Sequence, residues 1–241
     1  MRAIILAAGV GRRLGDSIEE RPKSLVDLGG ITLLGQLLDH LQALRVTPIT
    51  IVVGHLSHQI ESAVKGREGV RIAFNPEYRK GAVVSLRTAR EELCDDVLIM
   101  DADVLCPIEM LQRLIGSSHV NCFLMDSEAT DDGEAQMLMA TNGRVHDIRR
   151  GVRGTYDASG ESIGFLKLSG PAAETLRSLI DRAVSSGRDG IEHEEVYPEL
   201  MAACEIGYET VEGLEWLEVD FPEDVACARE MVARRALRAR S

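Results

Sequence analysis

The chain lacks the sequence features of membrane and secreted proteins. No run approaches the ~18 consecutive apolar residues of a membrane span, and the apolar run at 3–6 is too short for the core of a signal peptide. The five cysteines are odd in number, well separated and never spaced Cys-x-x-Cys, which favours free thiols in a reducing compartment. We therefore expect a cytoplasmic protein with no membrane partner.

Basic and aromatic residues are also scarce. The 241 residues include 27 Lys and Arg against 39 Asp and Glu, a formal net charge of -12. Nucleic acid binding needs a broad basic face, so we expect no nucleic acid partner. Aromatic residues make up 4% of the chain, which leaves few rings for a cage around a cation. His55 and His58 lack further histidine or cysteine partners, and they favour a polar helix start over a zinc site.

Apolar runs alternate with amphipathic segments through the first half of the chain. We expect buried strands at 3–6, 49–54 and 70–74, separated by amphipathic helices at 33–44 and 57–64. Such βαβαβ alternation needs crossover connections, and it predicts a parallel sheet with helices on both faces, a three-layer α/β/α fold. The length suits a single domain over 1–241.

The pattern changes in the second half. After a helix at 85–93, a strand at 97–100, a helix at 106–116 and a strand at 120–125, three short strands are expected at 135–140, 144–148 and 163–168. Asn142-Gly143 predicts a hairpin turn between the first two of these. Helices at 171–185 and 193–203, a strand at 217–219 and a final helix opening near Pro222 complete the chain.

The first expected strand runs into unusually small residues. Ala7-Ala8-Gly9-Val10-Gly11 leaves the backbone nearly bare at the carboxyl end of the strand, where open α/β sheets bind ligands. Bare N–H groups and flexible glycines suit a phosphate. Cations follow at Arg12, Arg13, Arg21 and Lys23 in an otherwise acidic chain. This combination predicts a polyanionic ligand, and the simpler alternative is a glycine-rich turn with solvated arginines.

Two familiar phosphate-binding motifs do not fit this loop. A P-loop requires Gly-x-x-x-x-Gly-Lys-Ser/Thr, which is absent. A dinucleotide-binding loop requires Gly-x-Gly-x-x-Gly, but Leu14 occupies the third glycine position and would obstruct close packing of helix and strand.

Two carboxylates follow the expected strand at 97–100. Asp101 and Asp103 are alternate residues of an extended segment, so both can face one pocket. Carboxylates near a phosphate ligand form the hard oxygen site that Mg²⁺ takes. The alternative is a pair of turn aspartates at a strand end.

The run Leu6-Ala7-Ala8-Gly9-x-Gly11-x-Arg13-Leu14, followed by Pro22-Lys23, resembles the signature of the sugar-nucleotidyltransferase-like family of nucleotidylyltransferases. Arg12 departs from the small polar residue usual at its position. The Asp-Ala-Asp-Val strand end and the closing Glu-Val-Asp-x-Pro-Glu-Asp are most similar to the phosphocholine cytidylyltransferase branch and its phosphonate-handling relatives. The resemblance implies a mostly parallel, Rossmann-like sheet of the GT-A-like nucleotidyltransferase type, with a small antiparallel insertion on the acceptor side.

The resemblance also implies a reaction: CMP moves from CTP to a small phosphorylated alcohol or phosphonate, and pyrophosphate is released. Arg13 and Lys23 are then the catalytic cations, and Asp103 and Asp220 hold Mg²⁺. Asp220 could instead be only a helix-entry residue, and Ser85 only an N-cap. The expected nucleotide-binding residues are Leu6, Ala7, Ala8, Gly9, Gly11, Arg12, Arg13, Lys23, Gly81, Ala82, Ser85 and Asp101.

The acceptor site is expected in the second half of the chain. Arg149, Arg150 and Lys167 are candidates for the acceptor phosphate, and Glu194 and Tyr197 for an amine at its other end. Glu194 and Glu195 could instead only favour the helix dipole. Three other functions stay open: a sugar-1-phosphate nucleotidylyltransferase using UTP, dTTP or GTP, a metal-dependent glycosyltransferase, and a non-catalytic nucleotide sensor. A homodimer is the candidate assembly.

Overall fold

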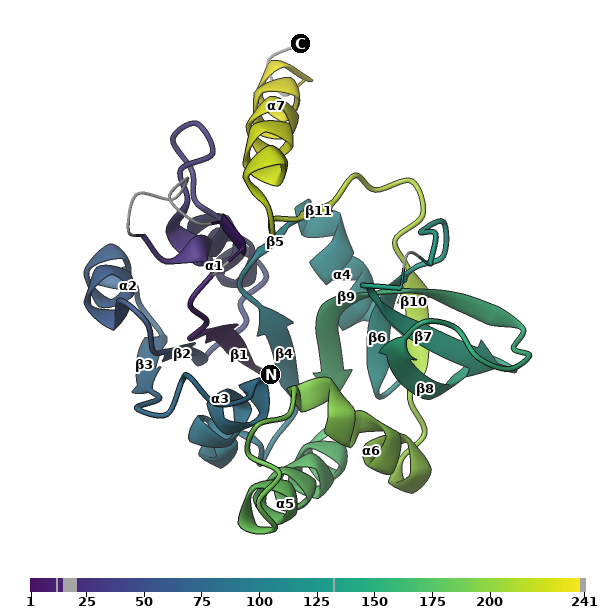
Figure 1. Ribbon diagram of the computed structural model, residues 1–241. Helices are drawn as coiled ribbons and strands as arrows, with labels where there is room; N and C mark the ends of the chain where they lie inside the picture. The colour runs from purple at the N-terminus through teal and green to yellow at the C-terminus, as the bar shows by residue number, and fades with distance from the viewer. Residues whose placement is uncertain (12, 15–20, 132, 239–241) are drawn as a thin grey trace.

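The computed structural model describes residues 1–11, 13–14, 21–131 and 133–238 (Figure 1). Within these residues nine strands form one sheet, whose main path runs β10-β6-β9-β4-β1-β2-β3. Its parallel centre consists of β1 (Arg2–Ala7), β2 (Ile49–Val53), β3 (Val70–Phe74) and β4 (Val97–Asp101). β1 lies between β2 and β4, so its carboxyl end opens at the middle of the sheet, beside the carboxyl end of β4.

The second half adds an antiparallel section. β9 (Ala158–Leu168) runs antiparallel between β4 and β6 (Cys122–Asp126), and β10 (Gly207–Thr210) pairs in parallel with β6. β7 (Gln136–Thr141) and β8 (Arg144–Arg150) form a hairpin at the side of the sheet, and β8 packs against α6 (Tyr197–Ala203) (Figure 1). Asn142 and Gly143 both have positive φ, at 52° and 74°, the backbone of a two-residue hairpin turn. The predicted antiparallel insertion and its turn are confirmed.

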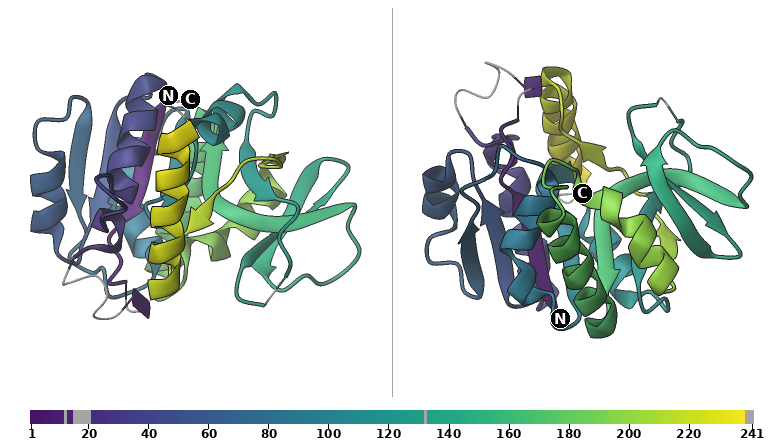
Figure 2. Two further views of the ribbon diagram at one scale, coloured as in Figure 1. Left: turned by 90° about the horizontal axis from the view of Figure 1, so that it is seen from above. Right: turned by 60° about the horizontal axis from the view of Figure 1, so that its bottom comes forward.

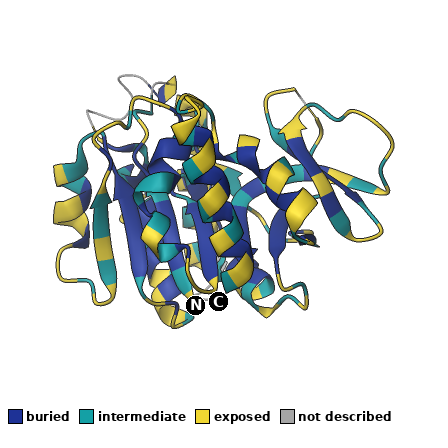
Figure 3. Ribbon diagram, turned by 90° about the horizontal axis from the view of Figure 1, so that it is seen from below, coloured by how far each residue is buried: buried dark blue, intermediate teal, exposed yellow. Residues whose placement is uncertain are grey.

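Helices cover both faces of the sheet (Figure 2). α1 (Leu33–Ala43), α2 (Ser57–Val64) and α4 (Ile108–Gly116) share one apolar cluster with the strands, and α3 (Ala82–Thr88), α5 (Gly170–Ser185) and α6 (Tyr197–Ala203) share a second. Figure 3 shows exposed residues on the outer sides of helices and buried residues on the central strands. Alternate residues of β1 point into opposite clusters, Ile4 into one and Ile5 into the other. The predicted three-layer α/β/α fold is confirmed.

A third apolar cluster docks the C-terminal helix. β5 (Val104–Leu105) pairs antiparallel with β11 (Leu217–Glu218), and α7 (Pro222–Arg238) follows. Leu105 and Val219 pack with Val225 of α7 in this cluster, which also contains Leu14 from the first loop. The C-terminal segment is thereby held beside the carboxyl ends of β1 and β4.

Several boundaries differ from the sequence-based expectations. α3 begins at Ala82 with Gly81 as its N-cap, so the interpretation of Ser85 as an N-cap is wrong. The expected helix at 193–203 is a 3₁₀ turn (His193–Val196) followed by α6, in whose first turn Pro198 lies. β9 extends five residues earlier than expected, because its first half pairs with β7. Among the described residues, no helix combines the length and apolar character needed to cross a bilayer.

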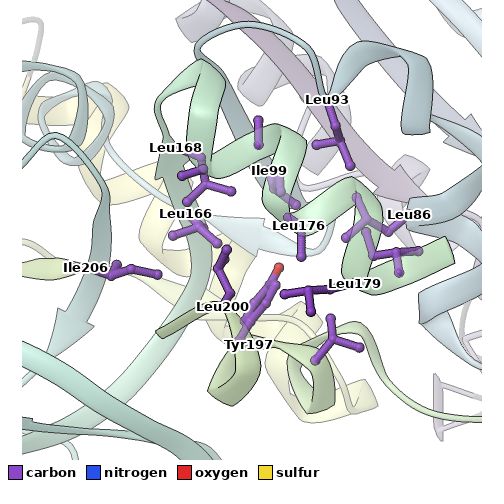
Figure 4. Packing of buried hydrophobic residues seen from close by; sticks show 14 of the residues in the cluster. Leu86, Leu93, Ile99, Leu166, Leu168, Leu176, Leu179, Tyr197, Leu200 and Ile206 are labelled. Atoms are coloured by element: carbon purple, nitrogen blue, oxygen red, sulfur yellow. The ribbon is translucent and has the colours of Figure 1, made fainter. Parts of the chain in front are cut away.

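The layer containing α3, α5 and α6 is densely packed (Figure 4). Leu176 and Leu179 of α5 and Leu200 of α6 surround the Tyr197 ring, close to Leu166 of β9. Each fully buried leucine contributes about 1.5–3 kcal/mol of transfer free energy. This layer therefore fixes the position of the turn at 193–196, which carries His193 and Glu194.

Gly81 lies where two segments touch. Its N–H donates to the carbonyl of Asp189 at 2.9 Å, and the N–H of Val83 donates to the carbonyl of Ile191 at 3.2 Å. A Cβ atom at Gly81 would lie 1.9 Å from the Ile191 carbonyl oxygen. Only glycine allows this close contact between backbone segments.

We expect Gly81→Ala to lower the free energy of unfolding by about 1–3 kcal/mol, because the new methyl group must push two backbone segments apart. Urea denaturation measures this change. Gly116→Ala is the matched control, since a Cβ atom there meets nothing within 4 Å. Equal stability of Gly81→Ala and the wild-type protein would contradict the close packing.

Candidate active site

The first loop forms one wall of a cavity of about 570 Å³. Gly11 has a φ of 65°, in the left-handed region that favours glycine. A Cβ atom built at Gly9 meets no atom within 4 Å, so the backbone there is open to a ligand. Small residues at the end of β1 thus expose main-chain N–H groups to the cavity, as a bound phosphate requires.

Most of the residues expected to bind a nucleotide line this cavity. Leu6, Ala7, Ala8, Gly9, Gly11, Arg13, Lys23, Ala82, Ser85 and Asp101 do so. Gly81 is the N-cap of α3 and lies just behind the lining, and Arg12 lies outside the described residues. The Ser85 hydroxyl accepts a hydrogen bond from the Asn75 amide at 3.0 Å, which leaves its own proton free to be donated to a ligand.

The cavity has further polar lining that the sequence analysis did not identify. Tyr78, Arg79 and Lys80 come from the turn before α3, and Glu192 comes from the loop after α5. The Lys80 ammonium forms an ion pair with Asp189 at 2.9 Å. The sequence does contain a signal for Arg79 and Lys80. They are two adjacent cations beside a glycine, as Arg12 and Arg13 are in the first loop.

Two cations and two carboxylates meet beside the first loop. The Lys23 ammonium donates to Asp103 Oδ2 at 2.8 Å and also contacts Asp220 Oδ1, and Arg13 donates to Asp220 Oδ2 at 2.9 Å. Burial alone would lower the pKa of Lys23, but the carboxylates of Asp103 and Asp220 outweigh it and raise that pKa. The Arg13 guanidinium lies 5.6 Å from the centre of the exposed Phe221 ring. The structure thus joins residues up to 207 positions apart.

A third carboxylate completes this cluster. Ligand oxygens of Asp103, Glu218 and Asp220 lie within 4.8 Å of one another, and the Val219 N–H donates to the Asp103 carbonyl at 3.0 Å. Asp103 Oδ1 is buried without a hydrogen-bond partner. An unpartnered carboxylate oxygen among further oxygen donors fits a hard cation such as Mg²⁺.

Glu218 was absent from the sequence-based site. It faces the same way as Asp220 because the two are alternate residues of an extended segment, the argument already applied to Asp101 and Asp103. Glu218 as a whole is exposed to solvent. The protein atoms around its carboxyl group nevertheless remove part of the hydration of that group. This desolvation, with the charges of Asp103 and Asp220, raises the pKa of Glu218 to about 8.

Asp101 belongs to a separate cluster. His193 Nε2 lies 3.5 Å from Asp101 Oδ1, and His193 Nδ1 lies 3.0 Å from Glu194 Oε2. Burial raises the pKa of Asp101 to about 6, although contact with His193 opposes this. On its other side Asp101 packs against Gly164, where a Cβ atom would lie 2.3 Å from Asp101 Oδ2.

A second cavity of about 180 Å³ adjoins the first. Arg13, Asp101, Asp103 and Glu192 line both cavities. Carboxylates dominate the second cavity, and Arg13 and Arg150 are the cations of its described lining. Its acidic residues are Asp101, Asp103, Glu134, Glu161, Glu192, Glu194, Glu218 and Asp220.

The expected acceptor residues separate in the structure. Arg150 and Glu194 line the second cavity. Arg149 contacts Asp147 instead, since neighbours on β8 point to opposite faces. The buried Lys167 pairs with Leu98, near the far end of β4, and donates to the Ser117 carbonyl at 3.0 Å. Tyr197 lies in the apolar layer (Figure 4). These three lie outside the lining of both cavities.

Neighbouring acids occupy the helix-capping positions. Asp224 accepts hydrogen bonds from the N–H groups of Asp220 and Phe221, at 2.9 and 2.7 Å. Glu195 forms a capping box with Glu192. Asp224 and Glu195 therefore serve the helix ends, and the carboxylates of Asp220 and Glu194 face the site.

We expect Glu218→Gln to raise the melting temperature at pH 8 and to change it little at pH 4.5. The folded pKa of about 8 exceeds the ordinary 4.5, so between these values the unfolded chain loses a proton that the folded protein keeps. The free energy of unfolding therefore falls as pH rises through this window, by an amount that solvent screening reduces.

Thermal melts in chelator-treated buffer measure this difference. Glu212→Gln, which changes an exposed glutamate outside the cluster, is the control. If Glu218→Gln follows the wild-type protein at both pH values, Glu218 is not crowded by the other carboxylates.

Known proteins resemble both the sequence and the fold. The chain is 28% identical over 235 residues to the choline-phosphate cytidylyltransferase of Streptococcus pneumoniae, and the alignment covers 96% of this chain and 98% of that protein. The solved CTP:phosphocholine cytidylyltransferase of S. pneumoniae superposes with a TM-score of 0.73 and 26% identity, over 96% of this chain and 98% of that one.

A longer relative matches as well. The chain is 29% identical over 240 residues to the bifunctional IPC transferase and DIPP synthase of Rubrobacter xylanophilus, covering 95% of this chain and 51% of that protein. The chain thus spans about half the length of this bifunctional relative.

The resemblance drawn from the sequence motifs is confirmed by these matches. Residues 3–155, more than half of the chain, match the MobA-like NTP transferase domain. That region contains the first loop, Lys23, Asp101 and Asp103, and the relatives that continue to the C-terminus align through Asp220 as well. The chain therefore belongs to the MobA-like NTP transferase domain family, and it is a nucleotidyltransferase.

Proposed function

We propose that this protein transfers CMP from CTP to a small phosphorylated alcohol or phosphonate, with release of pyrophosphate and with Mg²⁺ as cofactor. The observation that supports it most directly is the junction of the two cavities at Arg13, Asp101 and Asp103. A glycine-rich phosphate loop borders the first cavity, and a cluster of carboxylates borders the second. The reacting phosphates of donor and acceptor would meet at this junction.

The acceptor phosphate is already an anionic nucleophile, so the reaction needs no general base. The difficulty is to bring two polyanions together in line. Asp103 and Asp220 would hold Mg²⁺, with Glu218 alongside, and the bound ion would supply charge neutralisation at the α-phosphate. Arg13 and Lys23 lie within contact of these carboxylates, from which their N–H groups can turn to the leaving pyrophosphate.

The second cavity favours an acceptor with a cationic amine. Eight carboxylates against two arginines repel a wholly anionic ligand. Arg150, whose exposed ion pair with Glu134 is 3.8 Å long, would turn to the acceptor phosphate. No aromatic side chain contributes to the described lining, so the site lacks the cage that a quaternary ammonium usually occupies. A primary amine hydrogen-bonded to carboxylates such as Glu194 fits better.

A sugar-1-phosphate nucleotidylyltransferase is the second candidate. Carboxylates also accept hydrogen bonds from sugar hydroxyls, so the same lining could bind a hexose. This candidate predicts a preference for UTP, dTTP or GTP. It also predicts that a positive charge on the acceptor does not increase activity.

Pyrophosphate release should be measured for each nucleoside triphosphate against six acceptors: phosphocholine, phosphoethanolamine, 2-aminoethylphosphonate, 2-hydroxyethylphosphonate, inositol 1-phosphate and glucose 1-phosphate. We expect CTP with an amine-bearing acceptor to give the highest kcat/KM, because the amine binds among carboxylates. The hydroxyl and amine phosphonates form a pair matched in size. Preference for UTP or dTTP with glucose 1-phosphate would overturn the assignment, and binding without pyrophosphate release would favour a sensor.

Asp103→Asn and Asp220→Asn should each reduce kcat at least about 100-fold, because an amide keeps the shape and loses the charge that holds a hard cation. The double variant should be little worse than either single variant. Rates across a Mg²⁺ titration measure this loss, with Asp39→Asn on α1 as the exposed control. Wild-type Mg²⁺ dependence in Asp220→Asn would remove Asp220 from the metal site.

A further inference from the structure

His193 is a buried ionisable residue that the proposed reaction does not use. His193 is only 4% exposed to solvent, and it lines neither cavity. Its two neighbours do: Asp101 lines both cavities, and Glu194 lines the second. The imidazole therefore lies directly behind the carboxylates that an acceptor would contact.

The two carboxylates lie at opposite ring nitrogens. Asp101 is 3.5 Å from Nε2, and Glu194 is 3.0 Å from Nδ1. These are charge contacts and not aligned hydrogen bonds, since Nδ1 is buried without a hydrogen-bond partner. A neutral imidazole has no net charge, whereas an imidazolium carries a positive charge that attracts both carboxylates. One ligand atom from each of Asp101, His193 and Glu194 lies within 4.8 Å of the other two. The two carboxylates approach different ring nitrogens, and a metal ion takes only one of these nitrogens, so we favour an imidazolium as an electrostatic bridge between the carboxylates.

The ionisable groups around His193 support the same state. Asp101 comes from β4, Glu194 from the 3₁₀ turn and Tyr197 from α6. The positive charge of Arg150 on β8 also acts on Glu194. Burial alone would lower the pKa of His193, but the Glu194 and Asp101 carboxylates outweigh burial and raise it.

The protein interior holds the imidazole ring in place. The His193 and Tyr197 rings lie 5.5 Å apart, and the Tyr197 and Phe123 rings lie 5.8 Å apart. Phe123 and Tyr197 are buried in the same apolar cluster, in which Figure 4 shows Tyr197. On the opposite side Asp101 is confined by Gly164. The ring stack thus connects the rigid apolar core to carboxylates at the cavity wall.

We infer that His193 is a positioning residue, which holds the carboxylates of Asp101 and Glu194 at the acceptor cavity and so determines affinity for a cationic acceptor. This inference rests on the proposed function. Glu194 lines only the second cavity, so loss of His193 acts mainly on acceptor binding. Nucleotide binding, which depends on the first loop and Lys23, changes less.

His193→Gln keeps a polar side chain but removes the positive charge and the second donor nitrogen. With CTP and 2-aminoethylphosphonate as probe substrates, we expect the acceptor KM to rise at least about tenfold, while kcat and the KM for CTP change less than about threefold. His146→Gln, in the exposed part of β8, is the matched control. A His193→Gln enzyme with wild-type acceptor KM, or with a loss confined to kcat, overturns the inference.

A double-mutant cycle tests whether His193 acts through its neighbour. If it does, His193→Gln combined with Glu194→Gln should raise the acceptor KM little more than Glu194→Gln alone. Independent additive losses would contradict the coupling. Glu194→Gln also keeps the test available if His193→Gln does not fold, which thermal melting reveals.

A measurement without turnover separates this inference from the proposed function. In ¹⁵N-labelled protein, both ring nitrogens of His193, assigned by their loss in His193→Gln, should carry protons at pH 7.5, and Glu194→Gln should move the titration to lower pH. An ordinary titration near pH 6.5 overturns the bridge, whatever the activity. Absence of pyrophosphate release with every acceptor overturns the function instead.

Discussion

Three carboxylates crowd the end of β4 and β11, and their mutual repulsion is the constraint on which the site depends. Asp103, Glu218 and Asp220 bring negative charge together in a partly dehydrated region, where repulsion is stronger than in water. Lys23 and Arg13 offset part of it by direct ion pairs. Burial and the charges of Asp103 and Asp220 together raise the pKa of Glu218, and Lys23 opposes this only in part. Such residual negative charge suits the binding of a further cation.

The fold places opposite charges on the two sides of one junction. The first loop brings backbone N–H groups and cations from the end of β1, and β4 delivers carboxylates in the neighbouring position of the sheet. The antiparallel section adds the acidic second cavity without disturbing the parallel centre. A nucleoside triphosphate and a cationic acceptor would therefore each meet a complementary surface, and only their phosphates would share the central cations.

Short-range pattern predicted much of this arrangement. The apolar runs identified the sheet, and the small residues after the first strand identified the loop that lines the first cavity, because burial on both faces and a bare backbone leave direct traces in sequence. The place of Glu218 in the carboxylate cluster could not be predicted without the pairing of β11 with β5. Which of Arg149 and Arg150 faces the second cavity could not be predicted without the register of β8. Lys167 shows the limit most clearly. Its position on β9 is compatible with either end of the sheet until the antiparallel pairing with β4 is known.

The hydrogen bond from the Val219 N–H to the Asp103 carbonyl joins the backbones that carry two of the clustered carboxylates. It adjoins a ladder of only two residue pairs, between β5 and β11. Short ladders open by local fluctuation at lower cost than the centre of a sheet. The exchange rate of this single amide proton is therefore a local gauge of how often the carboxylate cluster comes apart, independent of the stability of the whole domain.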